Sequence, residues 1–233
     1  MKLEICANGL QSALNAEAGG ADRIELCVAL EQGGLTPSFG LIKEVKAILK
    51  IPIHILIRPW AGNFIYNDLE KLIILEDINQ CRELNVDGIV FGALTSEYNP
   101  DTEFLKKCIT LSGKMELTFH RAFDEMNRTD ANIDLLIELG FNRILTSGGA
   151  STAIEGKAEI ARLVNQFGQR IEIMAGSGIN ASNVTELTQE TRIKSVHCSA
   201  RIPQFSKANL LFEEDLVSDI VLVRKLKELV HST

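Results

Sequence analysis

Two cysteines, each preceded at two residues by a glutamate, end two apolar runs near the start of the chain. The runs are Leu3-Glu4-Ile5-Cys6 and Ile24-Glu25-Leu26-Cys27. Side chains along a strand alternate between faces, so in each run Glu and Cys share one face. Adjacent parallel strands lie about 4.8 Å apart, which would bring the two thiols together. A thiolate pair suits a soft ion such as Cu(I), whereas the alternative is that both cysteines are simply buried small hydrophobes.

Three of the four histidines follow the same alternation. His54, His120 and His197 each lie at polar positions within β-branched or apolar runs. The densest polar cluster is Thr118 to Asp124, where an imidazole stands beside a guanidinium and a carboxylate. These groups suit general acid–base work, and the candidate catalytic residues are Glu25, Arg58, His120 and Asp124. A buried ion network that does no chemistry is the alternative interpretation.

Short glycine- and serine-rich turns form a third group of candidates. Glycines at strand ends let backbone N–H groups approach an anion, and an arginine adds a bidentate partner. The predicted anion-binding residues are Ser147, Gly148, Gly176, Ser177, Gly178, Ser199 and Arg201. Tight turns without a ligand would explain the same glycines.

These residues need strands to position them, and strand-like runs recur along the chain. They fall near residues 3–6, 23–27, 53–58, 88–92, 116–120, 143–146, 171–175 and 195–199, with helix-like patterns between them. Among these patterns, 68–84 places Leu69, Leu72, Leu75 and Ile78 on one side, and 215–230 reads as a last helix. Eight alternating units predict an α/β fold, a single (β/α)8 TIM barrel over residues 1–233. An open doubly wound sheet is the alternative. Helices would cover both faces of such a sheet, which gives no reason for polar side chains along one face of nearly every strand.

A closed barrel explains why polar and apolar side chains alternate along the strands. The polar side chains would face a polar lumen, and the apolar ones would pack on helices. The predicted inward set is Glu4, Glu25, His54, Arg58, Thr118, His120, Glu172 and His197. The predicted outward set includes Ile5, Leu26, Ile55, Phe119, Ile173 and Val196.

Composition and charge indicate which kinds of partner and which cellular compartment suit the protein. The net charge of −7 argues against binding to nucleic acid or an anionic membrane. No apolar run approaches the roughly 20 residues of a membrane helix. Five irregularly spaced cysteines predict reduced thiols and a cytoplasmic protein. The apolar segment from Ile202 to Phe212 predicts either a cap over the barrel mouth or a homodimer contact.

Several long motifs resemble the CutC family of copper homeostasis proteins. They are Gly19 to Cys27, Gly33 to Ser38, Ile57 to Pro59, Thr118 to Asp124, Leu145 to Gly148 and His197 to Arg201, in matching order. The resemblance implies a cytoplasmic (β/α)8 barrel linked to copper, with Cu(I) as the ion at Cys6 and Cys27. One loop departs, because Trp60, Ala61, Asn63 and Asn67 replace the family's usual Arg, Gly, Asp and Ser. The lost guanidinium and carboxylate weaken any anionic-substrate role of this loop.

Two functions therefore remain open. The first is a copper homeostasis protein that binds Cu(I). The second is an enzyme that acts on a small phosphorylated or carboxylated metabolite, with His120 or Glu25 as the acid–base group and Arg58 and Arg201 as anion clamps.

Overall fold

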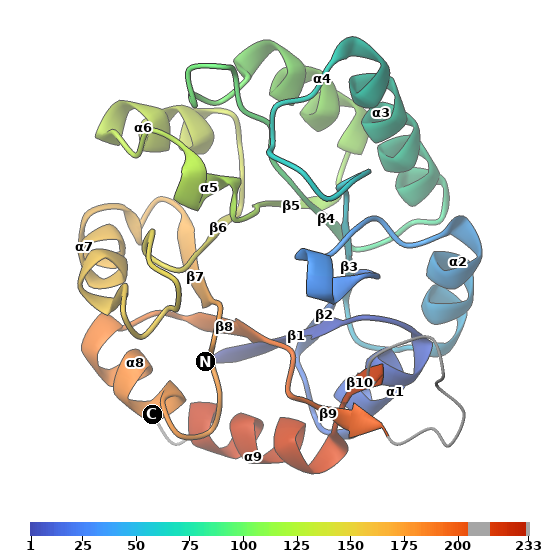
Figure 1. Cartoon of the computed structure of the whole chain (residues 1–233), viewed down its shortest axis with the longest axis vertical. Helices are drawn as coiled ribbons and strands as arrows, with labels where there is room; N and C mark the ends of the chain where they lie inside the picture. Colours follow the sequence, from blue (N-terminus) through green and yellow to red (C-terminus); the bar gives the residue numbers. More distant parts are fainter. Residues whose placement is uncertain (205–214, 232–233) are drawn as a thin grey trace.

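The computed structural model describes residues 1–204 and 215–231. Eight parallel strands close into a barrel in sequence order (Figure 1), which confirms the predicted (β/α)8 fold. The strands are β1 (Lys2–Ala7), β2 (Arg23–Leu26), β3 (Ile53–Leu56), β4 (Gly88–Phe91), β5 (Glu116–Phe119), β6 (Arg143–Thr146), β7 (Glu172–Gly176) and β8 (Ser195–Cys198).

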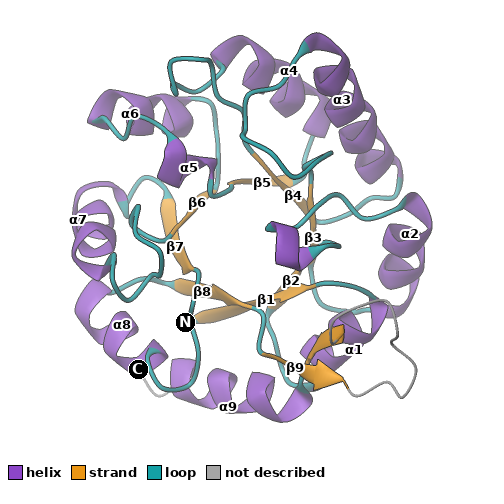
Figure 2. Cartoon of the chain, in the orientation of Figure 1, coloured by secondary structure: helices purple, strands orange, loops and turns teal. Residues whose placement is uncertain are grey.

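Helices surround this barrel (Figure 2). They are α1 (Leu10–Ala18), α2 (Phe39–Ile48), α3 (Asp68–Glu83), α4 (Thr102–Ser112), the short α5 (Ala122–Glu125), α6 (Asp130–Glu138), α7 (Lys157–Phe167), α8 (Val184–Thr191) and α9 (Ile220–His231). A 3-10 turn (Leu30–Gln32) follows β2, and β9 (Arg201–Gln204) pairs antiparallel with β10 (Asp215–Ser218). None of the helices in the described residues is long and apolar enough to cross a membrane.

The predicted alternation between lumen and helix face is confirmed. The outward set, Ile5, Leu26, Ile55, Phe119, Ile173 and Val196, belongs to the apolar core shared with the helices. The register places Glu4 beside both Arg23 and His197, and Glu25 beside both Cys6 and His54. The lumen is therefore polar, because every second side chain of these neighbouring strands faces it and these side chains are polar.

Two glycines of the β4 segment make room for lumen histidines. A Cβ on Gly88 would lie 2.7 Å from Nε2 of His54, and one on Gly92 would lie 2.8 Å from Nδ1 of His120. Both separations are too short for real contacts, so only glycine leaves space for these imidazoles.

Two local predictions were wrong. In α3, Leu69 and Leu72 are 74% and 61% exposed, and the buried positions are Ile74, Ile78 and Cys81. Of the predicted face, Ile78 is buried and Leu75 packs partly buried against the core, so the prediction failed at Leu69 and Leu72. The apolar spacing alone could not reveal which positions meet the barrel. The predicted helix over 215–230 begins only at Ile220, because 215–218 finds a strand partner in 201–204. Most of the apolar segment from Ile202 to Phe212 lies outside the described residues, and the homodimer stays a prediction.

Candidate functional site

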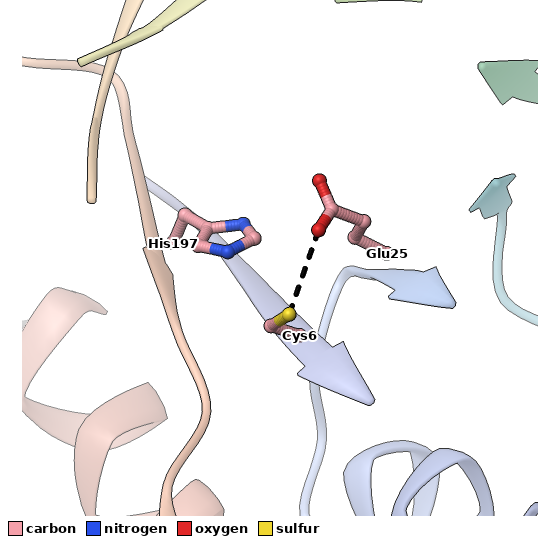
Figure 3. Close-up of side chains that lie close together, drawn as sticks. All are labelled: Cys6, Glu25 and His197. Atoms are coloured by element: carbon pink, nitrogen blue, oxygen red, sulfur yellow. Dashed lines mark hydrogen bonds between the residues drawn. The ribbon is translucent and has the colours of Figure 1, made fainter. Parts of the chain in front are cut away.

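A cavity of about 450 Å³ opens at the carboxyl ends of the barrel strands. Three titratable side chains from different strands meet in it: Cys6 of β1, Glu25 of β2 and His197 of β8 (Figure 3). One ligand atom from each of the three lies within 4.8 Å of the other two. Because these strands are neighbours in the closed barrel, closure itself assembles the cluster.

The predicted approach of the two cysteines is present. The Sγ atoms of Cys6 and Cys27 are 3.6 Å apart, and Cys6 Sγ also donates to Oε1 of Glu25 at 3.5 Å. The hydrogen bond with Cys27, burial and the Glu25 charge raise the pKa of Cys6 well above its ordinary value. Both thiols are buried, Cys27 completely. An ion that binds here must therefore displace thiol protons.

His197 is oriented from behind by Glu4. Its Nδ1 lies 2.7 Å from Oε1 of Glu4, and the other Glu4 oxygen accepts a hydrogen bond from Nε of Arg23. Burial opposes ionisation of Glu4, but Arg23 and His197 outweigh it and hold the pKa of the carboxyl well below its usual range. Burial likewise opposes protonation of His197, yet the charge of Glu25 and the bond with Glu4 raise its pKa. The carboxylate–imidazole pair fixes the ring, as second-shell carboxylates do at metal sites.

Glu25 carries an unused ligand atom. Its Oε2 is buried and has no hydrogen-bond partner among the described residues. Burial is the main cause that raises the pKa of Glu25. A buried carboxylate oxygen without a partner is costly, so this atom fits a bound ion or a hydrogen-bond donor on a ligand. A carboxyl group whose pKa is raised also suits proton transfer.

His120 and Arg58, two other predicted catalytic residues, line the same cavity from the segments that follow β5 and β3. Burial, together with the charge of Arg58, lowers the pKa of His120 to about 3. The imidazole is therefore neutral and a weak base at neutral pH. The Arg58 guanidinium donates to the carbonyl oxygens of Gln32, Gly34 and Gly62, at 2.9, 3.0 and 3.0 Å. Most of its donors thus hold loops together rather than remaining free for a ligand.

Asp124, the fourth catalytic candidate, lies outside the lining of this cavity. Its carboxylate accepts hydrogen bonds from the Thr146 hydroxyl at 2.5 Å and from the backbone N–H groups of Ser147 and Gly149, each at 3.0 Å. Arg121 pairs with it at 2.8 Å. The geometry gives Asp124 the task of holding the loop after β6.

The predicted anion-binding residues separate into two groups. Ser177, Gly178, Ser199 and Arg201 line the cavity, whereas Ser147, Gly148 and Gly176 do not. Nε of Arg201 donates to the Ser199 hydroxyl at 3.2 Å. The loops after β7 and β8 therefore form one wall, in the place where barrels of this kind often bind phosphate.

Sequence reasoning missed the ion network at the other end of the lumen. Arg143 donates to Oε2 of Glu116 at 2.6 Å and to the Thr118 hydroxyl at 3.1 Å. Its Nη1 also lies 3.4 Å from Nδ1 of His54. Arg143 and Arg23 are the first residues of their strands. Each lies at an alternate position that faces the lumen, and this spacing in the sequence could have revealed them.

This buried network predicts acid sensitivity. Burial is the main cause that lowers the pKa of His54 to about 4, and the positive charges of Arg23 and Arg143 lower it further. The negative charges of Glu4 and Glu116 act in the opposite direction. An unfolded histidine takes up its proton near 6.5, so the unfolded state binds more protons below that pH and the native state loses stability. Glu4 adds to the loss only below its ordinary value of 4.5.

We therefore expect the free energy of unfolding to fall between pH 6.5 and 4.5, as measured by urea denaturation at a series of pH values. His54→Gln should make this dependence shallower but not abolish it, because His120, whose pKa is lowered to about 3, contributes over the same range. His231→Gln, at an exposed position on α9, should leave it unchanged. An unchanged slope in His54→Gln would contradict the assignment.

The divergent loop has a structural explanation. Asn67 caps α3, since its side chain accepts from the backbone N–H groups of Leu69 and Glu70, while the Glu70 carboxylate accepts from the Asn67 N–H. Asn is a good N-cap, so the serine-to-asparagine change keeps that role. A Cβ on Gly62 would overlap the Trp60 ring, and the Gly62 carbonyl accepts from Arg58. The loop thus supports Arg58.

The closed barrel and its cavity define a TIM-barrel protein with thiol, carboxylate and imidazole groups in one pocket. The profile of the CutC family matches residues 1–202. The chain belongs to this family of copper homeostasis proteins.

Its relatives cover most of the chain. A CutC family protein of Glaesserella parasuis is 41% identical over 234 residues, which span 97% of this chain and 96% of the relative. The human copper homeostasis protein cutC homolog is 42% identical over 199 residues, 85% of this chain and 73% of the human protein. The crystal structure of CutC from Streptococcus agalactiae, at 40% identity, superimposes with a TM-score of 0.82 over 85% of this chain and 98% of that one.

Proposed function

We propose that this protein acts in copper homeostasis by binding Cu(I) through the thiolates of Cys6 and Cys27 in the cytoplasm. The observation that carries the proposal is the 3.6 Å separation of the two sulfurs, of which that of Cys6 belongs to a residue lining the cavity. Two sulfurs about 2.3 Å from one tetrahedral ion lie about 3.8 Å apart, so little movement is needed. Soft thiolates favour Cu(I) over hard cations.

Neighbouring groups fit such an ion as well. Oε2 of Glu25 lacks a partner among the residues described, and His197 lies within 4.8 Å of Cys6 and Glu25. A Cu(I) ion with two thiolates carries net negative charge, which the protonated His197 would balance. The raised pKa of His197 supports this assignment.

Anaerobic competition with a Cu(I) chelator tests the site. The Cys6→Ser/Cys27→Ser protein should lose more affinity than the about 10–100-fold that outer-shell changes produce at metal sites. The affinity of the wild type should rise with pH, because binding displaces a proton from a thiol of raised pKa.

Cys81→Ser/Cys108→Ser is the matched control, because it removes two buried thiols from α3 and α4, away from the cavity. Equal Cu(I) affinity in wild type and Cys6→Ser/Cys27→Ser would remove the cysteine site.

A second candidate is an enzyme acting on a small phosphorylated or carboxylated metabolite. It is favoured by the wall of Ser177, Gly178, Ser199 and Arg201 facing the cavity. Of the two acid–base candidates Glu25 suits proton transfer better, because its pKa is raised while that of His120 is lowered to about 3. Failure of every anionic metabolite in a thermal-shift screen to stabilise the protein would count against this candidate.

A further inference from the structure

Two hydrogen-bond donors on one wall of the cavity lack partners. Nε2 of His120 and Nε of Arg58 are buried, and neither has a hydrogen bond to any residue in 1–204 or 215–231. The two side chains are only 4% and 8% exposed, and both line the cavity. Buried polar groups are nearly always paired, so two neighbouring exceptions call for an explanation.

The surroundings fix His120 as a donor. Its Nδ1 accepts the backbone N–H of Ala122 at 3.2 Å, so in the neutral ring the proton is on Nε2. The ring packs on Phe64 with centroids 4.6 Å apart, and the absence of a side chain at Gly92 leaves its place open. The Nε2–H donor is therefore held in position before any ligand arrives.

Arg58 is held just as firmly. Three backbone carbonyls accept from its terminal nitrogens, and its Cζ lies 5.3 Å from the centroid of the same Phe64 ring. Nε–H remains available. Phe64 thus contacts both side chains and brings the two unused donors to one wall.

The charge of this wall selects the kind of acceptor. Arg58 supplies one positive charge and His120 is neutral. Arg121, the next residue in the chain, is engaged by Asp124 and Ser147. Arg201, which lines the cavity after β8, donates to the Ser199 hydroxyl. A single charge with two N–H donors matches a carboxylate, which accepts through two oxygens, better than a doubly charged phosphate.

We propose that His120 and Arg58 form a subsite for the carboxylate group of a small organic acid. The Nε2–H and Nε–H groups donate to its oxygens, and Phe64 covers its side. Leu56, Leu145 and Ile179 also line the cavity, so the rest of the ligand has an apolar portion. The volume of about 450 Å³ lies in the range of small-molecule sites. This inference is independent of copper binding and narrows the ligand class of the second candidate function.

Calorimetric titration of the full chain tests the subsite. The probes are lactate, pyruvate, succinate, 2-oxoglutarate and hexanoate, together with their primary amides and inorganic phosphate, in carboxylate-free buffer. At least one acid should bind saturably, one per chain, with its amide and phosphate at least tenfold weaker. Loss of one hydrogen bond to a charged group predicts an about 10–100-fold weaker complex for His120→Phe, which keeps the packing on Phe64.

Three further results decide the case. The Nε2–H proton resonance of His120 should shift on titration of the wild type with the acid that binds. Arg170→Met, which changes an exposed arginine outside the cavity lining, is the control and should bind this acid as the wild type does. His120→Phe should keep the Cu(I) affinity of the wild type, which separates this subsite from the copper site. The proposal is overturned if no acid in the panel binds at millimolar concentration, if phosphate binds best, or if Arg201→Met loses binding while His120→Phe keeps it.

Discussion

Replacing Arg23 by methionine is expected to lower the free energy of unfolding by about 3–5 kcal/mol, the usual effect of removing one partner of a buried ion pair. Arg23 pairs with Glu4, whose side chain is fully buried. Among the described residues, the variant leaves that carboxylate with His197 at 2.7 Å as its remaining ion-pair partner, and the pKa of Glu4 should rise. Equilibrium denaturation in urea at neutral pH measures the loss.

Two comparisons give the Arg23 experiment its meaning. Glu4→Gln in the Arg23→Met background should recover part of the stability, since it removes the unpaired charge. Lys157→Met is the matched control, because Lys157 makes its two ion pairs, with Glu186 and Glu190, on the exposed surface; such pairs contribute little. If Arg23→Met and Lys157→Met unfolded alike, the lumen pair would not hold the barrel together.

Asp124→Ala should destabilise the protein by about 3 kcal/mol, because hydrogen bonds to charged groups are strong and buried donors without partners are costly. The carboxylate, with a side chain only 5% exposed, is the common acceptor for Thr146, Ser147 and Gly149. The amides of Ser147 and Gly149 should lose protection in hydrogen exchange. Denaturation and exchange measured together would report both effects.

The position of Asp124 outside the cavity lets one experiment distinguish a structural role from a catalytic one. Because Asp124 does not line the cavity, Asp124→Asn should keep ligand and Cu(I) binding while losing part of the stability. Asp130→Ala, at an exposed position, is the control. Loss of binding without loss of stability in Asp124→Asn would instead restore the catalytic role that the sequence suggested.

Alternation along the strands was enough to predict the barrel and its polar lumen. The face on which a strand side chain lies follows from its position along the strand, because side chains alternate between faces. This holds for His54, His120 and His197 and for the two Glu-x-Cys pairs, since their strands are all buried in the barrel. The approach of Cys6 and Cys27 was predictable for the same reason, since it needs only that β1 and β2 be neighbours. The buried face of α3 was predicted correctly at Ile78 but not in full, because Ile74 and Leu75 are equally apolar and only packing against the barrel chooses between them.

The sequence by itself determined which residues face the lumen and which family the motifs resemble. The tertiary structure alone decided their roles, because those depend on partners that are distant in the chain. His197 meets Glu4 across the β8–β1 closure of the barrel. Asp124 turns towards the loop after β6 and away from the cavity. Arg58 is bound by loop carbonyls, and the donors that it and His120 leave unused become visible only when every other hydrogen bond has been placed.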